Sequence, residues 1–174
     1  MASIIAAIDR LAAALAVAGA WAGAVILSSV AALILLEIVL RSFFSRSTQI
    51  LEEYVGYGLG AMIFLGLGHA LRQGALVRVD LLLGALGPLT RRIFEIMVCA
   101  VTLPVMLFLM NYFLISVQRN YRQGTISMTV AATPIWIPEA IVLTGMAIFT
   151  LQVVVYALRL VAGGPLVEDL GRID

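Results

Sequence analysis

The ionisable side chains near the apolar stretches of this chain are few and widely spaced. Glu37 and Arg41 stand four residues apart, so this pair can neutralise itself on one helix face. His69, the only histidine of the chain, comes three residues before Arg72. Hydrolysis within a membrane, metal-assisted chemistry or phosphate transfer would require clustered His, Asp, Glu, Cys or an activated Ser. The pattern therefore predicts that the chain is not an enzyme and holds no metal ion or cofactor of its own.

Three uncharged polar or sulfur-containing residues within the apolar stretches are candidates for a specific role. Asn111 and Gln152 are the polar residues nearest the middle of the third and fourth stretches. A hydrogen bond between helices is the interpretation we favour for each, with a contact to a substrate as the alternative. Cys99 is the single cysteine, which makes an intramolecular disulfide impossible, and we expect it to be a small buried packing residue.

The elements that must position these side chains are four uncharged apolar segments, each close to the ~20 residues that cross about 30 Å of hydrocarbon. Counted between the nearest charges, they cover residues 11–36, 54–71, 96–118 and 140–158. Hydrophobic residues make up 63% of the chain and charged residues only 12%, against roughly one quarter charged in soluble proteins. We therefore predict an all-α integral membrane protein, a single domain of residues 1–174 with four transmembrane helices.

The distribution of arginine predicts the orientation of these helices. With four spans, the amino terminus, the middle loop and the carboxyl tail share one side of the membrane, which carries seven arginines against four on the other side. Because positively charged loops tend to stay in the cytoplasm, both termini are predicted to be cytoplasmic. The first apolar segment is longer than the apolar region of a signal peptide, so we expect it to be retained as a helix. Scattered arginines with a net charge of +1 give no indication of nucleic-acid binding.

The first connecting segment, residues 37–53, mixes apolar and charged side chains. Such a mixture is typical of a chain that leaves the membrane and then lies in the headgroup region. Thr48 is predicted to cap the second helix. Glu52 and Glu53 would then lie in its first turn, where carboxylates suit the positive end of the helix.

The other two connections also predict amphipathic segments at the membrane surface. In residues 72–95, apolar residues at helical spacing predict a short horizontal helix, with Arg78 and Asp80 facing water or a partner. Residues 123–138 hold too many hydroxyls and prolines for a further crossing. Their interfacial anchor is expected to consist of Trp136, Pro134 and Pro138, with a re-entrant loop as the alternative.

Small residues suggest close helix packing. Gly19 and Gly23 in the first span, and Gly56 and Gly60 in the second, have the four-residue spacing that lets helix backbones approach, and Gly66 extends the small-residue content of the second helix. Spans without interior charges make a poor transport path, whereas small residues and interfacial segments make a good surface for another membrane protein. The residues themselves therefore indicate an accessory subunit.

A longer motif begins at the acidic pair of the second helix. It continues with Phe-Leu-Gly, a basic residue, a glycine, Val-Asp-Leu, a proline and two further arginines. These elements are Glu52, Glu53, Phe64, Leu65, Gly66, Arg72, Gly74, Val79, Asp80, Leu81, Pro88, Arg91 and Arg92, with Arg41, Pro134, Trp136 and Pro138 as further matches. The pattern resembles the small membrane subunit of tripartite ATP-independent periplasmic (TRAP) transporters. Where that family often has a histidine this chain has Leu76, so no role of that histidine is carried over.

The resemblance implies the small permease subunit of a sodium-coupled, binding-protein-dependent transporter for organic acid anions, in the bacterial cytoplasmic (inner) membrane. Such a subunit scaffolds the large elevator-type permease subunit, does not itself bind solute, and leaves sodium to the large subunit. The implied partners are that large subunit, a periplasmic solute-binding protein and membrane lipids. The partner-interface candidates are Gly56, Gly60, Gly66, Glu52, Glu53, Arg41, Arg72, Arg78 and Asp80. A self-sufficient small oligomeric channel or exporter is the alternative.

Overall fold

Four long helices form the described part of the chain, which comprises residues 2–74 and 88–161 of a computed structural model. They are α1 (Ala2–Phe44), α2 (Leu51–Arg72), α4 (Pro88–Gln123) and α5 (Trp136–Val161). Each of them is long and apolar enough to cross a membrane. The predicted all-α architecture with four membrane-spanning helices agrees with this arrangement.

Two of the helices extend far beyond the predicted spans. α1 has 43 residues and α4 has 36. At 1.5 Å per residue α1 is about 65 Å long, roughly twice the thickness of the hydrocarbon. Charged residues mark where a helix meets the headgroup region, but the backbone hydrogen bonds continue past them. Counting between charges therefore finds the spans and underestimates the helices.

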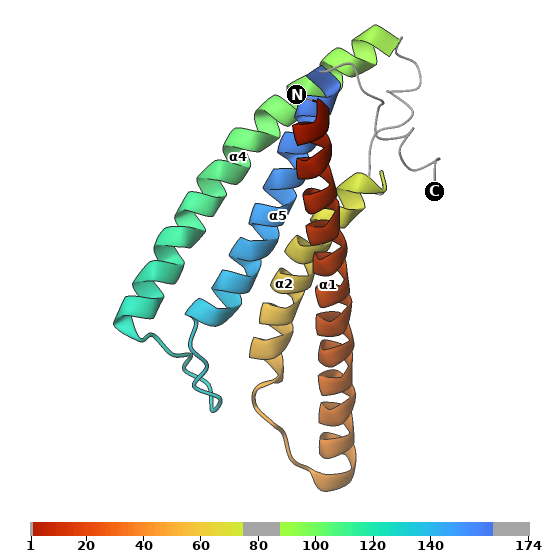
Figure 1. Ribbon diagram of the computed structural model, residues 1–174. Coiled ribbons are helices and arrows are strands. Elements are labelled where there is room, and N and C mark those ends of the chain that lie inside the picture. The colour runs from red at the N-terminus through yellow and green to blue at the C-terminus, as the bar shows by residue number, and fades with distance from the viewer. Residues whose placement is uncertain (1, 75–87, 162–174) are drawn as a thin grey trace.

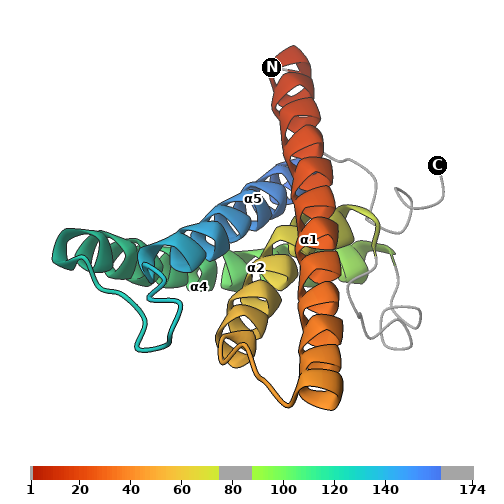
Figure 2. The same cartoon turned by 90° about the horizontal axis from the view of Figure 1, so that it is seen from below.

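α5 is the central helix of the bundle. It packs against α1, α2 and α4, and α2 also packs along α1. In α5, 50% of the apolar window is buried, compared with 11% in α1 and in α4. The bundle has two distinct ends: an amino end, where α1 begins and α2 ends, and a loop end, which carries residues 45–50 and 124–135. Helices α1 and α5 converge at the amino end and separate towards the loop end (Figures 1 and 2).

Glycines allow the closest helix contacts, as the spacing of Gly19 and Gly23 predicted. A Cβ atom added to Gly19 of α1 would lie 2.8 Å from the carbonyl oxygen of Leu65 in α2, and one added to Gly23 would lie 3.3 Å from the carbonyl oxygen of Met62. At Gly145 of α5 an added Cβ would lie 2.7 Å from the carbonyl carbon of Phe64. Helix α2 is thus held between α1 and α5 by backbone contacts that a larger residue would prevent.

Large apolar side chains fill the amino end, where α4 and α5 are packed together. This cluster consists of Leu71, Cys99, Phe149, Val153, Tyr156 and Leu160. Cys99 is buried, which confirms its prediction as a small packing residue.

Candidate interaction site

A polar network joins three helices at the amino end. Asp9 of α1 accepts a hydrogen bond from Arg72 of α2 at 2.9 Å and also pairs with Arg159 of α5. The Arg72 guanidinium reaches the side-chain oxygen of Gln152 at 3.5 Å, and the Gln152 amide donates to the carbonyl oxygen of Ala12. The predicted interhelical hydrogen bond of Gln152 is confirmed, and Arg72 is used within the chain.

The fourth helix is attached at the same end by a different contact. Arg92 of α4 donates through its Nε atom to the carbonyl oxygen of Leu160 at 3.0 Å. Leu160 lies in the last turn of α5, where carbonyl oxygens have no partner within their own helix. A basic side chain there also suits the negative end of the helix dipole. All four helices are therefore tied together at the amino end.

At the loop end, a buried carboxylate organises the turn between α1 and α2. The Glu37 side chain is 2% exposed and accepts hydrogen bonds from Arg41 at 2.8 Å, from Ser47 and from both the backbone and the hydroxyl of Thr48. The predicted Glu37–Arg41 pair is present. The prediction that Thr48 caps α2 is wrong, because Thr48 turns back to Glu37, and α2 starts after Ile50 without a side-chain cap.

The acidic pair at the start of α2 is divided between two environments. Glu53 accepts a hydrogen bond from Thr129 in the loop between α4 and α5, and the neighbouring Tyr54 hydroxyl lies 3.1 Å from the Thr133 hydroxyl. A single β-bridge between Ile126 and Pro134 closes this loop into a hairpin. Glu52 is exposed. Glu53 thus positions the hairpin, while Glu52 is available to another molecule.

The start of α5 is fixed against the end of α4. Glu139 accepts hydrogen bonds from Ser116 at 3.0 Å and from Asn120 at 2.9 Å. Trp136 packs edge-to-face on Tyr121, with ring centroids 5.3 Å apart. The carboxylate therefore holds a neighbouring helix in addition to suiting the dipole of its own. The role of Trp136 as a membrane anchor stays a prediction.

One face of α2 is left uncovered by the rest of the chain. The residues on it recur at helical spacing, and we call it the open face: Glu52, Gly56, Leu59, Ile63 and Gly66. A Cβ added to Gly56 or Gly66 would meet nothing within 4 Å. Gly60 instead faces Val142 of α5, at an ordinary contact distance of 3.5 Å. Of the three glycines expected at a partner interface, two are therefore open and one is used internally.

The sequence comparison decides the family. The family described as tripartite ATP-independent periplasmic transporters, DctQ component, matches residues 30–163, about three quarters of the chain. The chain belongs to this family. Comparisons with curated proteins and with solved structures gave no significant match. As a DctQ component, the chain is a multi-pass membrane protein and a component of a TRAP transporter, and its family implies association with the large permease subunit and a periplasmic binding protein.

Part of the signature motif of this DctQ component lies outside the described residues. This applies to Arg78, Asp80 and Leu76, and to the horizontal helix predicted within residues 72–95. Among the residues that the structure does describe, no group of three His, Cys, Asp or Glu side chains is placed to hold a metal ion.

Asn111 differs from the prediction made for it. It is exposed on α4, and it forms no hydrogen bond with another helix within residues 2–74 and 88–161. An amide group at the middle of a span gains from a hydrogen-bond partner.

Two structural residues of this DctQ component were missed by the sequence reasoning. Gly145 makes the tightest approach to α2, and Gly58 of α2 would place an added Cβ against Val30 of α1. Neither belongs to a pair with four-residue spacing, so the pattern gave no reason to single them out. The only available signal was a glycine within a transmembrane helix, which is common.

Proposed function

We propose that this chain is the small permease subunit of a sodium-coupled, binding-protein-dependent TRAP transporter for organic acid anions in the bacterial inner membrane. In this role it scaffolds the large elevator-type permease subunit and does not itself bind solute or sodium. Both of its termini lie in the cytoplasm. Family membership supports the transporter assignment, and the features below support the scaffolding role.

Ion pairs and hydrogen bonds stabilise the bundle at both ends, as the role of a rigid scaffold requires. At the amino end, Asp9 connects three helices through Arg72 and Arg159. At the loop end, Glu37 holds the first turn and Glu139 joins α5 to α4. A domain that moves through the membrane needs a rigid neighbour to move against, and contacts distributed over both ends oppose relative motion of the helices.

Several polar groups within the spans are occupied by the chain itself, whereas Asn111 is exposed; the occupied groups argue against a solute path. Four hydroxyl groups donate to the carbonyl oxygen four residues earlier in their own helix: Ser28, Ser29, Thr144 and Thr150. Gln152 is buried and bonded to Ala12. An organic anion would need unoccupied donors or a cationic side chain at membrane depth.

The open face of α2 is the observation that carries the proposed contact with the large subunit. A glycine exposed to lipid gains nothing, and in a helix it costs about 1 kcal/mol relative to alanine. Gly56 is exposed and Gly66 is half-buried; both lie on one face, and a Cβ added to either would meet nothing within 4 Å. A second helix could approach closely there, and the exposed carboxylate of Glu52 would lie at the edge of the contact. Asn111 on α4 supplies a second point of contact with a polar partner.

Three of the interface candidates also form hydrogen bonds within the chain: Arg41, Glu53 and Arg72. Replacing Glu53 or Arg72 would alter contacts between elements of the subunit as well as any contact with a partner. Substitutions at the two glycines of the open face separate the two effects, because a Cβ added to Gly56 or Gly66 would meet nothing in this chain within 4 Å.

The test is co-purification of the large subunit with Gly56→Leu and Gly66→Leu variants. We expect each leucine to reduce recovery of the large subunit and sodium-dependent uptake in proportion, because it blocks close approach of the partner helix. Ala24→Leu is the matched control, since Ala24 is exposed on α1. Undiminished recovery with both glycine variants would exclude the open face. Recovery of the chain alone, or as a homo-oligomer with flux of its own, would refute the scaffold function.

The exposed arginines of the loop end give a second, independent test. Arg46 and Arg122 both lie there, on the side that the proposed orientation places in the periplasm. We propose that they meet acidic groups of the solute-binding protein. Charge reversal to Glu should raise the concentration of binding protein needed for half-maximal uptake, with assembly unchanged. Unaltered uptake kinetics in the double variant would exclude this contact.

The segment between α2 and α4 carries part of the family motif, and we call it the signature loop. Arg72 is unsuitable for testing this loop, because it already pairs with Asp9 within the chain. Asp80 lies outside the described residues, and Asp80→Ala tests whether the loop contributes to the complex. We expect reduced recovery of the large subunit with an unchanged thermal stability of the isolated chain. Normal assembly together with normal uptake would remove the loop from the proposed interface.

A further inference from the structure

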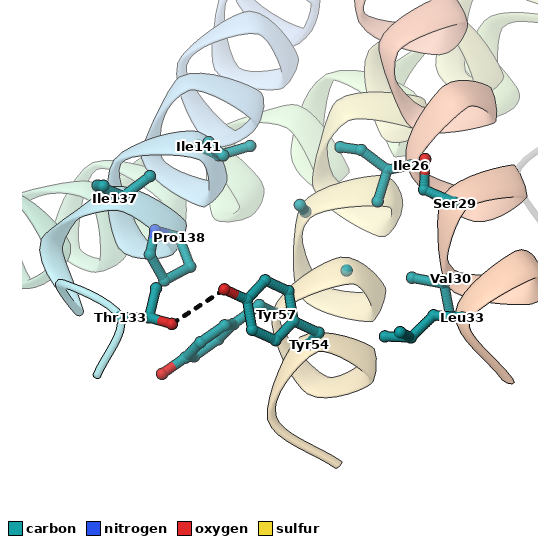
Figure 3. A pocket seen from close by; sticks show the side chains of 12 residues that line it. Ile26, Ser29, Val30, Leu33, Tyr54, Tyr57, Thr133, Ile137, Pro138 and Ile141 are labelled. Atoms are coloured by element: carbon teal, nitrogen blue, oxygen red, sulfur yellow. Dashed lines mark hydrogen bonds between the residues drawn. The ribbon is translucent and has the colours of Figure 1, made fainter. Parts of the chain in front are cut away.

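A groove opens between α1 and α5 at the point where the two helices separate over α2 (Figure 3). Its volume is about 260 Å³. Helix α1 forms one wall, the start of α5 and the preceding loop form the other, and α2 forms the base. The lining residues are Ile26, Ser29, Val30, Leu33, Tyr54, Tyr57, Gly58, Ala61, Thr133, Ile137, Pro138 and Ile141.

The groove presents no charged side chain, and three of its hydroxyl groups have partners within the chain. Ser29 donates to the carbonyl oxygen of Val25 at 2.9 Å, and the hydroxyls of Tyr54 and Thr133 bond each other at 3.1 Å. A solute anion would find no cationic partner among the lining residues. The groove therefore suits an apolar occupant.

Its depth in the membrane identifies the apolar material available to fill it. The α1 wall, from Ile26 to Leu33, lies inside the span predicted for residues 11–36. Water does not fill apolar cavities, and an empty groove would forfeit the van der Waals contacts of its lining. Hydrocarbon is the solvent at this depth, and it can enter between α1 and α5 from the side.

The shape of the groove suits a thin flexible chain. It is a wedge between α1 and α5 whose lining is mostly aliphatic and aromatic (Figure 3). An acyl chain has no fixed width and can follow the wedge between the two helices.

The polar groups of the groove are gathered towards its loop end. Tyr54, Tyr57 and Thr133 lie there, whereas the aliphatic residues of α1 continue towards the middle of the bundle (Figure 3). Tyrosine is typical of the boundary between hydrocarbon and headgroups. A lipid lying along the groove would therefore have its headgroup near the loop end and its tail between α1 and α5.

We propose that this groove binds one acyl chain of a membrane phospholipid, which fills the space where α1 and α5 separate. The tail acts as a packing element and fixes the angle between the two helices. Because the competing environment is also hydrocarbon, retention depends on van der Waals contacts with the groove and not on removal from water. Filling the groove with protein atoms should therefore release the lipid without unfolding the chain.

Two variants fill the groove, and each has a matched control. One control lies on the same helix as its groove variant, and the other has the same exposed fraction. Ser29→Leu fills the groove, whereas Ser28→Leu alters a neighbouring serine whose hydroxyl bonds its own helix in the same way. Ile141→Phe enlarges a side chain that lines the groove, and Ile34→Phe enlarges one outside it. Ile141 and Ile34 are both 37% exposed, so each has room to grow.

The measurement is native mass spectrometry of the full chain released from nanodiscs of phosphatidylethanolamine and phosphatidylglycerol. We expect wild type and both controls to retain one phospholipid. The groove variants should retain about fivefold less, since several weak carbon–carbon contacts are lost together. Equal retention in all five proteins would overturn the proposal. So would groove variants that keep their lipid but lose the large subunit, because a side chain of that subunit would then be the occupant.

Discussion

The same substitution at two glycines should have opposite effects on stability. Gly145→Ala places a methyl group between α5 and α2, where it would lie 2.7 Å from the Phe64 carbonyl carbon and 2.8 Å from the Leu65 amide nitrogen. Gly56→Ala places the same methyl group on the open face of α2, with nothing within 4 Å. The chemistry of the change is identical, so the difference reports the packing alone.

The expected magnitude follows from these distances. Contacts of a Cβ atom are ordinary only from 3.4 Å outwards, and the atoms opposing Gly145 belong to the backbone, so the two helices must move apart. Overpacking of this kind costs about 1–3 kcal/mol, and the alanine returns about 1 kcal/mol through its better helix propensity. We expect a net loss of up to about 2 kcal/mol for Gly145→Ala. Gly56→Ala should be neutral or stabilising by up to about 1 kcal/mol.

The single cysteine provides the assay. Cys99 is buried in the core, so a thiol-reactive fluorophore labels it only when the helices separate during heating. For a chain of this size, about 1 kcal/mol corresponds to roughly 2–4 °C in the unfolding midpoint. Gly145→Ala should therefore unfold several degrees below wild type, and Gly56→Ala at or above it. Equal midpoints for the two variants would refute the claim that Gly145 is required for the approach of α5 to α2.

Three further predictions concern the polar contacts. Asp9→Asn leaves Arg72 and Arg159 without their shared carboxylate and should cost about 1–2 kcal/mol, since the site is only partly exposed; an unchanged midpoint would contradict this. Glu139→Gln replaces two charge-assisted hydrogen bonds and should cost about 1 kcal/mol, with faster amide exchange where α4 meets α5. Thr129→Val should speed amide exchange in the hairpin while the global midpoint stays within about 1 °C; no change in the hairpin would show that its bond to α2 is unimportant.

The four-residue spacing of glycines predicted a helix contact correctly in α1 but not throughout α2. The four-residue spacing of Gly19 and Gly23 indicated a close approach, and α2 lies against both. The same spacing at Gly56 and Gly60 did not reveal that these glycines face different surroundings. Residues four apart lie on roughly one side of a helix, but spacing does not say which neighbour, if any, is on that side.

For polar residues too, the sequence gives the residue type but not the hydrogen-bond partner. Gln152 and Asn111 have equivalent positions in their spans and received the same interpretation, yet Gln152 is bonded to α1 and Asn111 is exposed. Thr48 has the residue type of a helix cap, but the Glu37 carboxylate captures its hydroxyl. A charged acceptor forms the stronger hydrogen bond, and its position depends on how the turn folds.

The sequence by itself determined that this chain is a membrane protein with four helices and that it belongs to the DctQ component family. Those conclusions depend on the length and polarity of segments and on a motif, all of which are local properties of the chain. Only the tertiary structure decided which faces of the helices remain free, namely the open face of α2 and the groove between α1 and α5. Inside a membrane, apolar residues suit lipid and protein neighbours equally. Hydropathy therefore cannot distinguish a buried helix face from an exposed one, and the packing of the helices must.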